Sequence, residues 1–126
     1  MQYHEFVGQV QDRARLGSEG EAMQAIRATL SALGTRLHGG EANDIAAQLP
    51  DGIAHFLTRA ERNEPLTMRA FYEQVQEAEQ VDFPEAVFHA RVVMQVLEEA
   101  ISGGEMQDIR AQLPAEYEDL FEPVGE

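Results

Sequence analysis

The side chains with the widest chemical range in this sequence are its four histidines, His4, His38, His55 and His89. A helical metal site commonly places two histidines four residues apart, and no two of these histidines have that spacing. His89 does follow Asp82 and Glu85 on one predicted helix, so these three side chains could offer hard and borderline ligands to a divalent ion. The alternative, which the sequence favours, is a solvated helix face with no metal ligand and no cofactor.

A second candidate is the stretch His-Gly-Gly-Glu at residues 38–41, where a general-base candidate stands beside a glycine turn. One interpretation is a ligand-binding loop with free backbone N–H groups. The other is a helix C-cap, because glycine readily enters the left-handed conformation that ends a helix. The glycine pair recurs at residues 103–104 after Ser102, without a histidine. We therefore favour the structural interpretation and predict a positive φ angle for Gly39 and Gly103.

Two arginines, Arg27 and Arg91, stand beside the apolar stripes of two predicted long helices. The stem of such an arginine can lie along the edge of the core while its guanidinium reaches an acid. The expected partners are Glu41, Glu105, Asp44 and Asp108. Binding of an external anion is the alternative role.

Gln48 and Gln112 each precede a Leu-Pro pair. Proline pushes the residue before it out of helical dihedral angles and leaves backbone groups without helical partners. We expect each glutamine to satisfy such groups beside Pro50 or Pro114, with substrate binding as the alternative.

No catalytic constellation is visible in the sequence. The chain has no cysteine, which excludes a thiolate nucleophile, a thiolate metal site and a disulfide. It also lacks a G-x-S-x-G nucleophile elbow, a phosphate-binding P-loop and a G-x-G-x-x-G loop. We therefore expect no catalytic residue and no enzymatic activity.

The elements that would position these residues are helices throughout. Apolar residues recur at the helical i, i+3, i+4, i+7 spacing in residues 2–15 and 19–38, and again in the second half of the chain. Ser18, Thr67 and Asp82 stand where N-caps are expected. The residues predicted to be buried are Phe6, Val10, Ile26, Leu30, Leu33, Ile45 and Leu49, with Phe71, Val75, Ala90, Met94, Leu97, Ile109 and Leu113 as their counterparts.

The chain contains one segment twice. Residues 39–50 return as residues 103–114, and nine of the twelve positions are identical. The match extends upstream, so the sequence predicts one all-α domain of two tandem repeats, 2–57 and 67–121, joined by a linker at 58–66. Each repeat would have two long and two short helices, and both would share one core in a pseudo-twofold bundle, because about 60 residues alone form a marginal domain. The shared motif residues are Gly39, Gly40, Glu41, Asp44, Gln48 and Pro50, with Gly103, Gly104, Glu105, Asp108, Gln112 and Pro114 as their counterparts.

The paired motif G-G-E-x-x-D-I-x-x-Q-L-P resembles that of the DUF2267 family, small bacterial and archaeal proteins that carry a domain of unknown function. Phe6 with Val10, the Leu-His pair at residues 37–38 and His-Ala-Arg at residues 89–91 extend the resemblance over roughly residues 2–122. It implies an all-helical duplicated fold and supplies no activity and no catalytic residues. The second copy departs from the pattern because Ser102 replaces the histidine.

The net charge of −14 is unevenly distributed. Residues 1–63 hold eight acids and six arginines, a balance of −2, whereas residues 64–126 hold fifteen acids and three arginines, a balance of −12. A surface of this sign repels phosphate backbones and anionic lipid, so we expect neither nucleic acid nor membrane as a partner. The N-terminus lacks the basic and apolar regions of a signal peptide, and no apolar run approaches the ~20 residues of a membrane span, which predicts a cytoplasmic protein.

These observations predict a non-enzymatic helical interaction or regulatory module whose protein partner the sequence does not identify. The alternative is a small-ligand or metal-binding protein with a site between the two repeats. A third interpretation is an acidic decoy that occupies a nucleic-acid-binding protein through residues 64–126.

Overall fold

The structure is a computed structural model that describes residues 1–124, and these residues form helices and turns with no strand among them. The prediction of an all-α fold is confirmed. No described helix is both long enough and apolar enough to cross a membrane. In chain order the helices are α1 (Tyr3–Arg13), α2 (Glu19–Arg36), α3 (Glu41–Ala46), α4 (Asp51–Thr58), α5 (Met68–Glu79), α6 (Phe83–Ala100), α7 (Gly103–Gln112) and the 3-10 helix η1 (Ala115–Phe121).

Three polar side chains begin helices where the sequence predicts them. Ser18 Oγ accepts a hydrogen bond from the Glu21 backbone N–H at 3.2 Å. The side chains of Thr67 and Asp82 accept in the same way from the N–H groups three residues on, at 3.0 and 2.9 Å. Each bond satisfies one backbone donor that the first turn of a helix leaves without a helical partner. These caps fix the starts of α2, α5 and α6.

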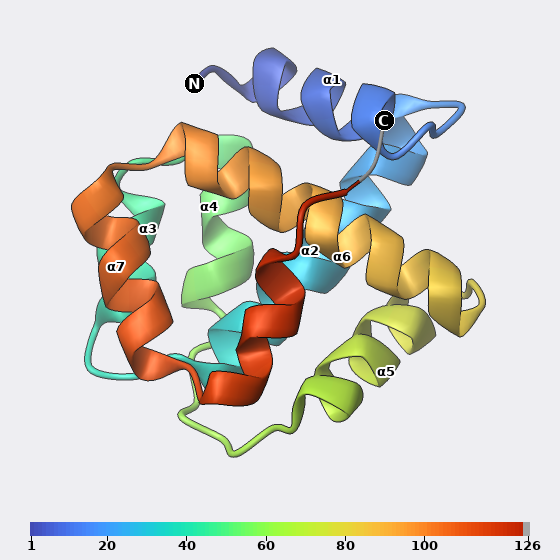
Figure 1. The fold of residues 1–126 in the computed structure, drawn as a ribbon. Helices are drawn as coiled ribbons and strands as arrows, with labels where there is room; N and C mark the ends of the chain where they lie inside the picture. The colour runs from blue at the N-terminus through green and yellow to red at the C-terminus, as the bar shows by residue number, and fades with distance from the viewer. Residues whose placement is uncertain (125–126) are drawn as a thin grey trace.

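The two 18-residue helices α2 and α6 pass through the centre of the molecule (Figure 1). Helix α2 packs against α1, α4, α5 and α6, and helix α6 packs against α1, α2, α5 and η1. The short helix α3 and helix α7 lie side by side at one edge of the molecule and contact each other. One helix from each half of the chain therefore contributes to this edge.

The predicted core is confirmed at all positions but one. The residues predicted to be buried are at most 7% exposed, apart from Leu113, which is half-buried. Leu113 follows the last residue of α7 in extended backbone, so its side chain no longer lies on the inward helix face. The confirmed residues belong to a single apolar cluster that includes residues from both halves of the chain.

Gly34 sets the distance between α2 and α4. A Cβ atom built at this position would lie 2.6 Å from the Leu57 carbonyl oxygen and 2.9 Å from the Ala60 Cβ. Two helices approach this closely only where one of them has no side chain. The sequence offers no local signal for this contact, because Gly34 stands within an ordinary helical pattern.

Candidate metal centre

The chain makes a left-handed turn between α2 and α3. Gly39 and Gly40 have φ angles of 68° and 84°, which confirms the prediction for Gly39. The turn is not a C-cap of α2, because α2 ends at Arg36 and Leu37 continues in extended backbone. Gly40 is the N-cap residue of α3, and its N–H donates to Glu61 Oε2 at 3.0 Å.

The second glycine pair adopts a different conformation, and the prediction of a positive φ angle for Gly103 is wrong. Gly103 is the first residue of α7. Ser102 is the N-cap, and its Oγ accepts a hydrogen bond from the Glu105 N–H at 3.2 Å. A histidine, as at position 38, is not among the residues that cap well. Helix α7 therefore starts earlier in the motif than α3 does, and Asp108 lies in the middle of α7.

This difference gives a prediction for two alanine variants. Gly39→Ala should lower the free energy of unfolding by about 1 kcal/mol, because only glycine enters the left-handed region without strain. Gly103→Ala should be neutral or stabilising by up to about 0.5 kcal/mol, because alanine favours helix and nothing lies within 4 Å of the added Cβ. Urea denaturation measures both. Equal losses in the two variants would contradict the two conformations.

Gln48 and Gln112 hold α3 and α7 together through reciprocal hydrogen bonds. Ser102 N–H donates to Gln48 Oε1 at 2.7 Å, and Gln48 Nε2 donates to Ser102 Oγ at 3.4 Å. His38 N–H donates to Gln112 Oε1 at 3.1 Å, and Gln112 Nε2 donates to the His38 carbonyl at 3.0 Å. The glutamines thus satisfy backbone groups as predicted, but these groups belong to the other copy of the motif and were not freed by the prolines.

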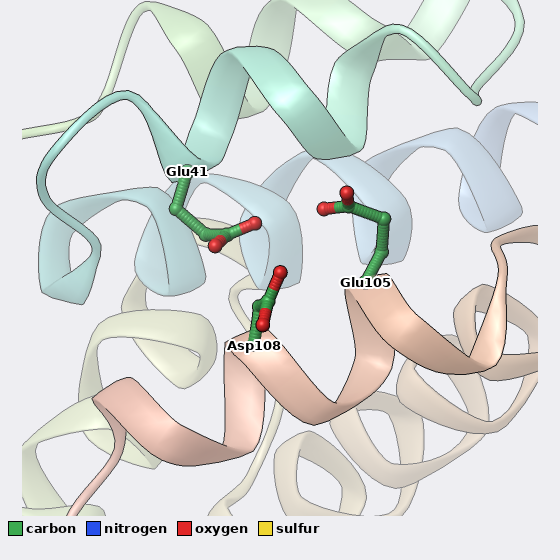
Figure 2. Close-up of side chains that lie close together, drawn as sticks. All are labelled: Glu41, Glu105 and Asp108. Carbon is green, nitrogen blue, oxygen red and sulfur yellow. The ribbon is translucent and has the colours of Figure 1, made fainter.

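Three carboxylates meet where α3 and α7 lie side by side. Glu41 is the first residue of α3, whereas Glu105 and Asp108 are one turn apart on α7. Figure 2 shows the Glu41 carboxylate pointing from α3 toward the two acids of α7. One oxygen from each residue lies within 4.8 Å of the other two.

The geometry of this acidic cluster, Glu41, Glu105 and Asp108, leaves oxygen atoms without hydrogen-bond donors. Glu41 is only 7% exposed, and Oε2 of Glu41 and Oε2 of Glu105 are both buried without a hydrogen-bond partner. Asp108 is exposed to solvent. Buried carboxylates are ordinarily paired with a cation or with hydrogen-bond donors, because an ionised carboxylate loses its hydration on burial.

The surroundings of Glu41 strongly favour its protonated form. The pKa of Glu41 is raised to about 7. Burial is the largest cause, and Glu105 contributes through a hydrogen bond to the protonated carboxyl and through its negative charge. Charge repulsion from Asp108 and Asp44 makes smaller contributions to the same rise. A bound cation would act in the opposite direction because it stabilises the charged carboxylate. The cluster can therefore hold either a shared proton or a cation.

The arginines expected beside these acids lie elsewhere. Arg91 Nη2 pairs with Asp119 Oδ2 at 2.9 Å, and Arg91 Nε donates to the Asp119 carbonyl at 3.0 Å. Arg27 forms no ion pair with any residue in the described part of the chain and lines a groove over α2 and α4. The prediction that Arg27 and Arg91 pair with the motif acids is therefore wrong.

His89 does not lie on a solvated helix face, and it does not form a metal site with Asp82 and Glu85. Its Nδ1 lies 2.8 Å from Glu79 Oε2, and both side chains are buried between α5 and α6. The hydrogen bond to Glu79 raises the pKa of His89. Asp82 caps α6 and Glu85 is exposed, so these two acids and His89 do not form a site. His38 is exposed, with its backbone rather than its ring held by Gln112.

Comparison with known proteins places the chain in a family. The family model described as "Uncharacterized conserved protein (DUF2267)" matches residues 3–120, nearly the whole chain. The chain belongs to the DUF2267 family. The resemblance seen in the motif is confirmed, and this DUF2267 protein carries both copies of the motif within the matched residues. No curated protein matches the chain.

Proposed function

We propose that this protein binds a divalent cation between α3 and α7, with the carboxylates of Glu41, Glu105 and Asp108 as ligands. The observation that carries the proposal is the buried Glu41 carboxylate, which points at two further acids and leaves Oε2 without a donor. This is the sequence-based alternative of a metal site between the two repeats, with the ligands drawn from the shared motif.

The ligand chemistry favours a hard cation of the size of Ca²⁺ or Mn²⁺. All three ligands offer oxygen, which such ions prefer over nitrogen or sulfur. Oxygens on opposite sides of Ca²⁺ are about 5 Å apart at usual bond lengths, and the three oxygens of the cluster lie within 4.8 Å of one another. Arg110, two residues after Asp108, pairs with Glu98 at 2.9 Å. No ion pair among the described residues includes Glu41, Glu105 or Asp108. A divalent ion would offset two of the three negative charges.

The role we propose is regulatory rather than enzymatic. A cation at this place would join two segments that are 64 positions apart in the chain, and would thereby stabilise one edge of a helical interaction module. We also propose that the two halves are duplicated units related by a pseudo-twofold axis. The reciprocal bonds of Gln48 and Gln112, and the same order of two longer and two shorter helices in both halves, support this arrangement. The cytoplasmic location stays a prediction.

Isothermal titration calorimetry with CaCl₂ and MnCl₂ at pH 8 tests the cation site. We expect saturable binding, with affinity weakened by about tenfold or more in Glu41→Gln, Glu105→Gln and Asp108→Asn, because each variant removes a charged ligand. Asp44→Asn is the matched control, since Asp44 is the motif counterpart of Asp108 but lies outside the cluster. Its affinity should stay within about threefold of the wild type, as expected for a charge that acts only at a distance.

Absence of saturable binding up to millimolar cation, or equal affinity in the wild type and Glu41→Gln, would overturn the proposal. Circular dichroism of each variant shows whether the helices are retained. A loss of affinity in a variant that keeps its helical spectrum and cooperative melting is therefore due to the ligand and not to unfolding.

A further inference from the structure

The groove over α2, α4 and α5 gathers positive charge in a strongly acidic protein. Its lining residues are Arg27, Ser31, Thr35, His55, Phe56, Arg59, Ala60, Arg62 and Gln74. Three of the nine arginines of the chain are in this set, and no aspartate or glutamate is. The chain has 23 acids against nine basic residues, so a cationic groove is contrary to the overall charge.

The three arginines of the groove have no ion-pair partner among the described residues, a property that they share with Arg15 and Arg36 outside the groove. Arg69, Arg91 and Arg110 each form an ion pair with an acid. Arg27, Arg59 and Arg62 form none with any residue from 1 to 124. All three residues are exposed and can approach an external oxyanion. Three clustered cations repel one another, and an anion bound between them would offset this repulsion.

The position of these residues follows from the helices. Arg27, Ser31 and Thr35 recur every four residues along one face of α2, the spacing that places side chains in a row. Arg59 and Arg62 line the same groove from the segment that follows α4. Thr35 Oγ1 donates to the Ser31 carbonyl, so it is already satisfied. The rings of His55 and Phe56 are half-buried, with centroids 4.3 Å apart, and form one wall.

We propose that this groove binds the phosphate group of a small molecule, with Arg27, Arg59 and Arg62 as the phosphate ligands. Guanidinium groups bind phosphate through paired N–H donors, which makes arginine well suited to this anion. The groove has a volume of about 590 Å³, within the range of about 300–1,000 Å³ that small-molecule sites commonly have. The aromatic wall can stack on a planar ring carried by the same molecule.

The proposal is independent of the cation site, and its test is carried out in EDTA. Titration calorimetry with inorganic phosphate and with AMP, at low ionic strength, should show saturable binding in the folded full-length chain. Tighter binding of AMP than of phosphate would identify an aromatic phosphate ester as the ligand class. Equal affinity for both would identify the phosphate group alone.

Charge-neutralising variants distinguish binding in the groove from nonspecific electrostatic attraction to the protein surface. Arg27→Gln, Arg59→Gln and Arg62→Gln should each weaken binding by about tenfold, the usual effect of losing a charge-assisted hydrogen bond. Arg110→Gln is the control, because it removes the same charge from an exposed site outside the groove. The proposal is overturned if neither probe binds below about 1 mM, or if Arg110→Gln weakens binding as much as the three groove variants.

Discussion

Replacing Gly34 with alanine should destabilise the fold by about 3 kcal/mol, at the upper end of the usual cost of overpacking a core. The added Cβ would lie 2.6 Å from the Leu57 carbonyl oxygen. This oxygen belongs to the backbone of α4, so a rotamer change cannot relieve the contact and α4 must move away from α2. Urea denaturation followed by circular dichroism measures the loss.

Gly8→Ala provides the matched control for this variant. Gly8 also lies within a helix, but nothing is within 4 Å of a Cβ built there. The variant should gain about 0.5–1 kcal/mol, because alanine restricts the unfolded chain and favours helix. If Gly34→Ala were as stable as Gly8→Ala, this result would contradict the close packing of α2 against α4 at Gly34.

The second large effect is expected from Glu41→Gln in the absence of cations. At pH 8 this variant should be more stable than the wild type by up to roughly 3 kcal/mol, the free energy that corresponds to the raised pKa of Glu41. The amide has nearly the same shape as the carboxyl and can donate a hydrogen bond to Glu105. It therefore replaces the protonated acid without the cost of burying a negative charge.

The pH dependence of the wild type follows from the same pKa values. Glu41 has a pKa of about 7 in the folded protein against an ordinary glutamate pKa of 4.5, so the folded protein binds more protons between these pH values. Stability must then fall as pH rises from about 4.5 to 7. His89, whose pKa is also raised, adds a loss of the same sign at higher pH. That loss is common to both proteins and cancels in the difference.

Thermal and urea melts from pH 4.5 to 8.5 in EDTA measure this difference. The two proteins should be closest in stability near pH 4.5 and diverge up to about pH 7, because Glu41 ionises in the unfolded chain while it stays protonated in the folded one. Addition of CaCl₂ at pH 8 should stabilise the wild type more than Glu41→Gln at the same concentration, because stabilisation by a ligand grows with its affinity for the folded state. Parallel profiles of stability against pH for the two proteins would show that the pKa of Glu41 is not raised by folding.

Local chemistry is sufficient to predict the helices and most of the core. The caps at Ser18, Thr67 and Asp82 act within one turn, and apolar spacing places Leu33 and Leu97 on inward faces. The repeated motif nevertheless misleads at the second glycine pair. The decisive difference is Ser102 in place of His38, because a short side chain with an oxygen atom moves the start of α7 by two residues.

Contacts between distant segments could not be predicted in the same way. No local pattern indicates that Glu79 pairs with the buried His89, or that Arg91 reaches Asp119 rather than an acid of the motif. Glu41 and Glu105 are the same position of the repeated motif. In the pseudo-twofold arrangement that we propose, equivalent positions of the two copies would meet at the axis. The repeat therefore contained a signal for the cluster, but only a prediction that α3 and α7 pack together would have made it visible.

The most direct measurement of the cation site is a crystal structure of the protein grown with MnCl₂, with anomalous scattering recorded. We predict an anomalous peak bounded by the carboxylate oxygens of Glu41, Glu105 and Asp108, and its loss in crystals of Glu41→Gln. An absence of density between these residues, with the Glu41 and Glu105 carboxyl groups in direct hydrogen-bond contact, would contradict the account and identify the cluster as a pair of acids that share a proton.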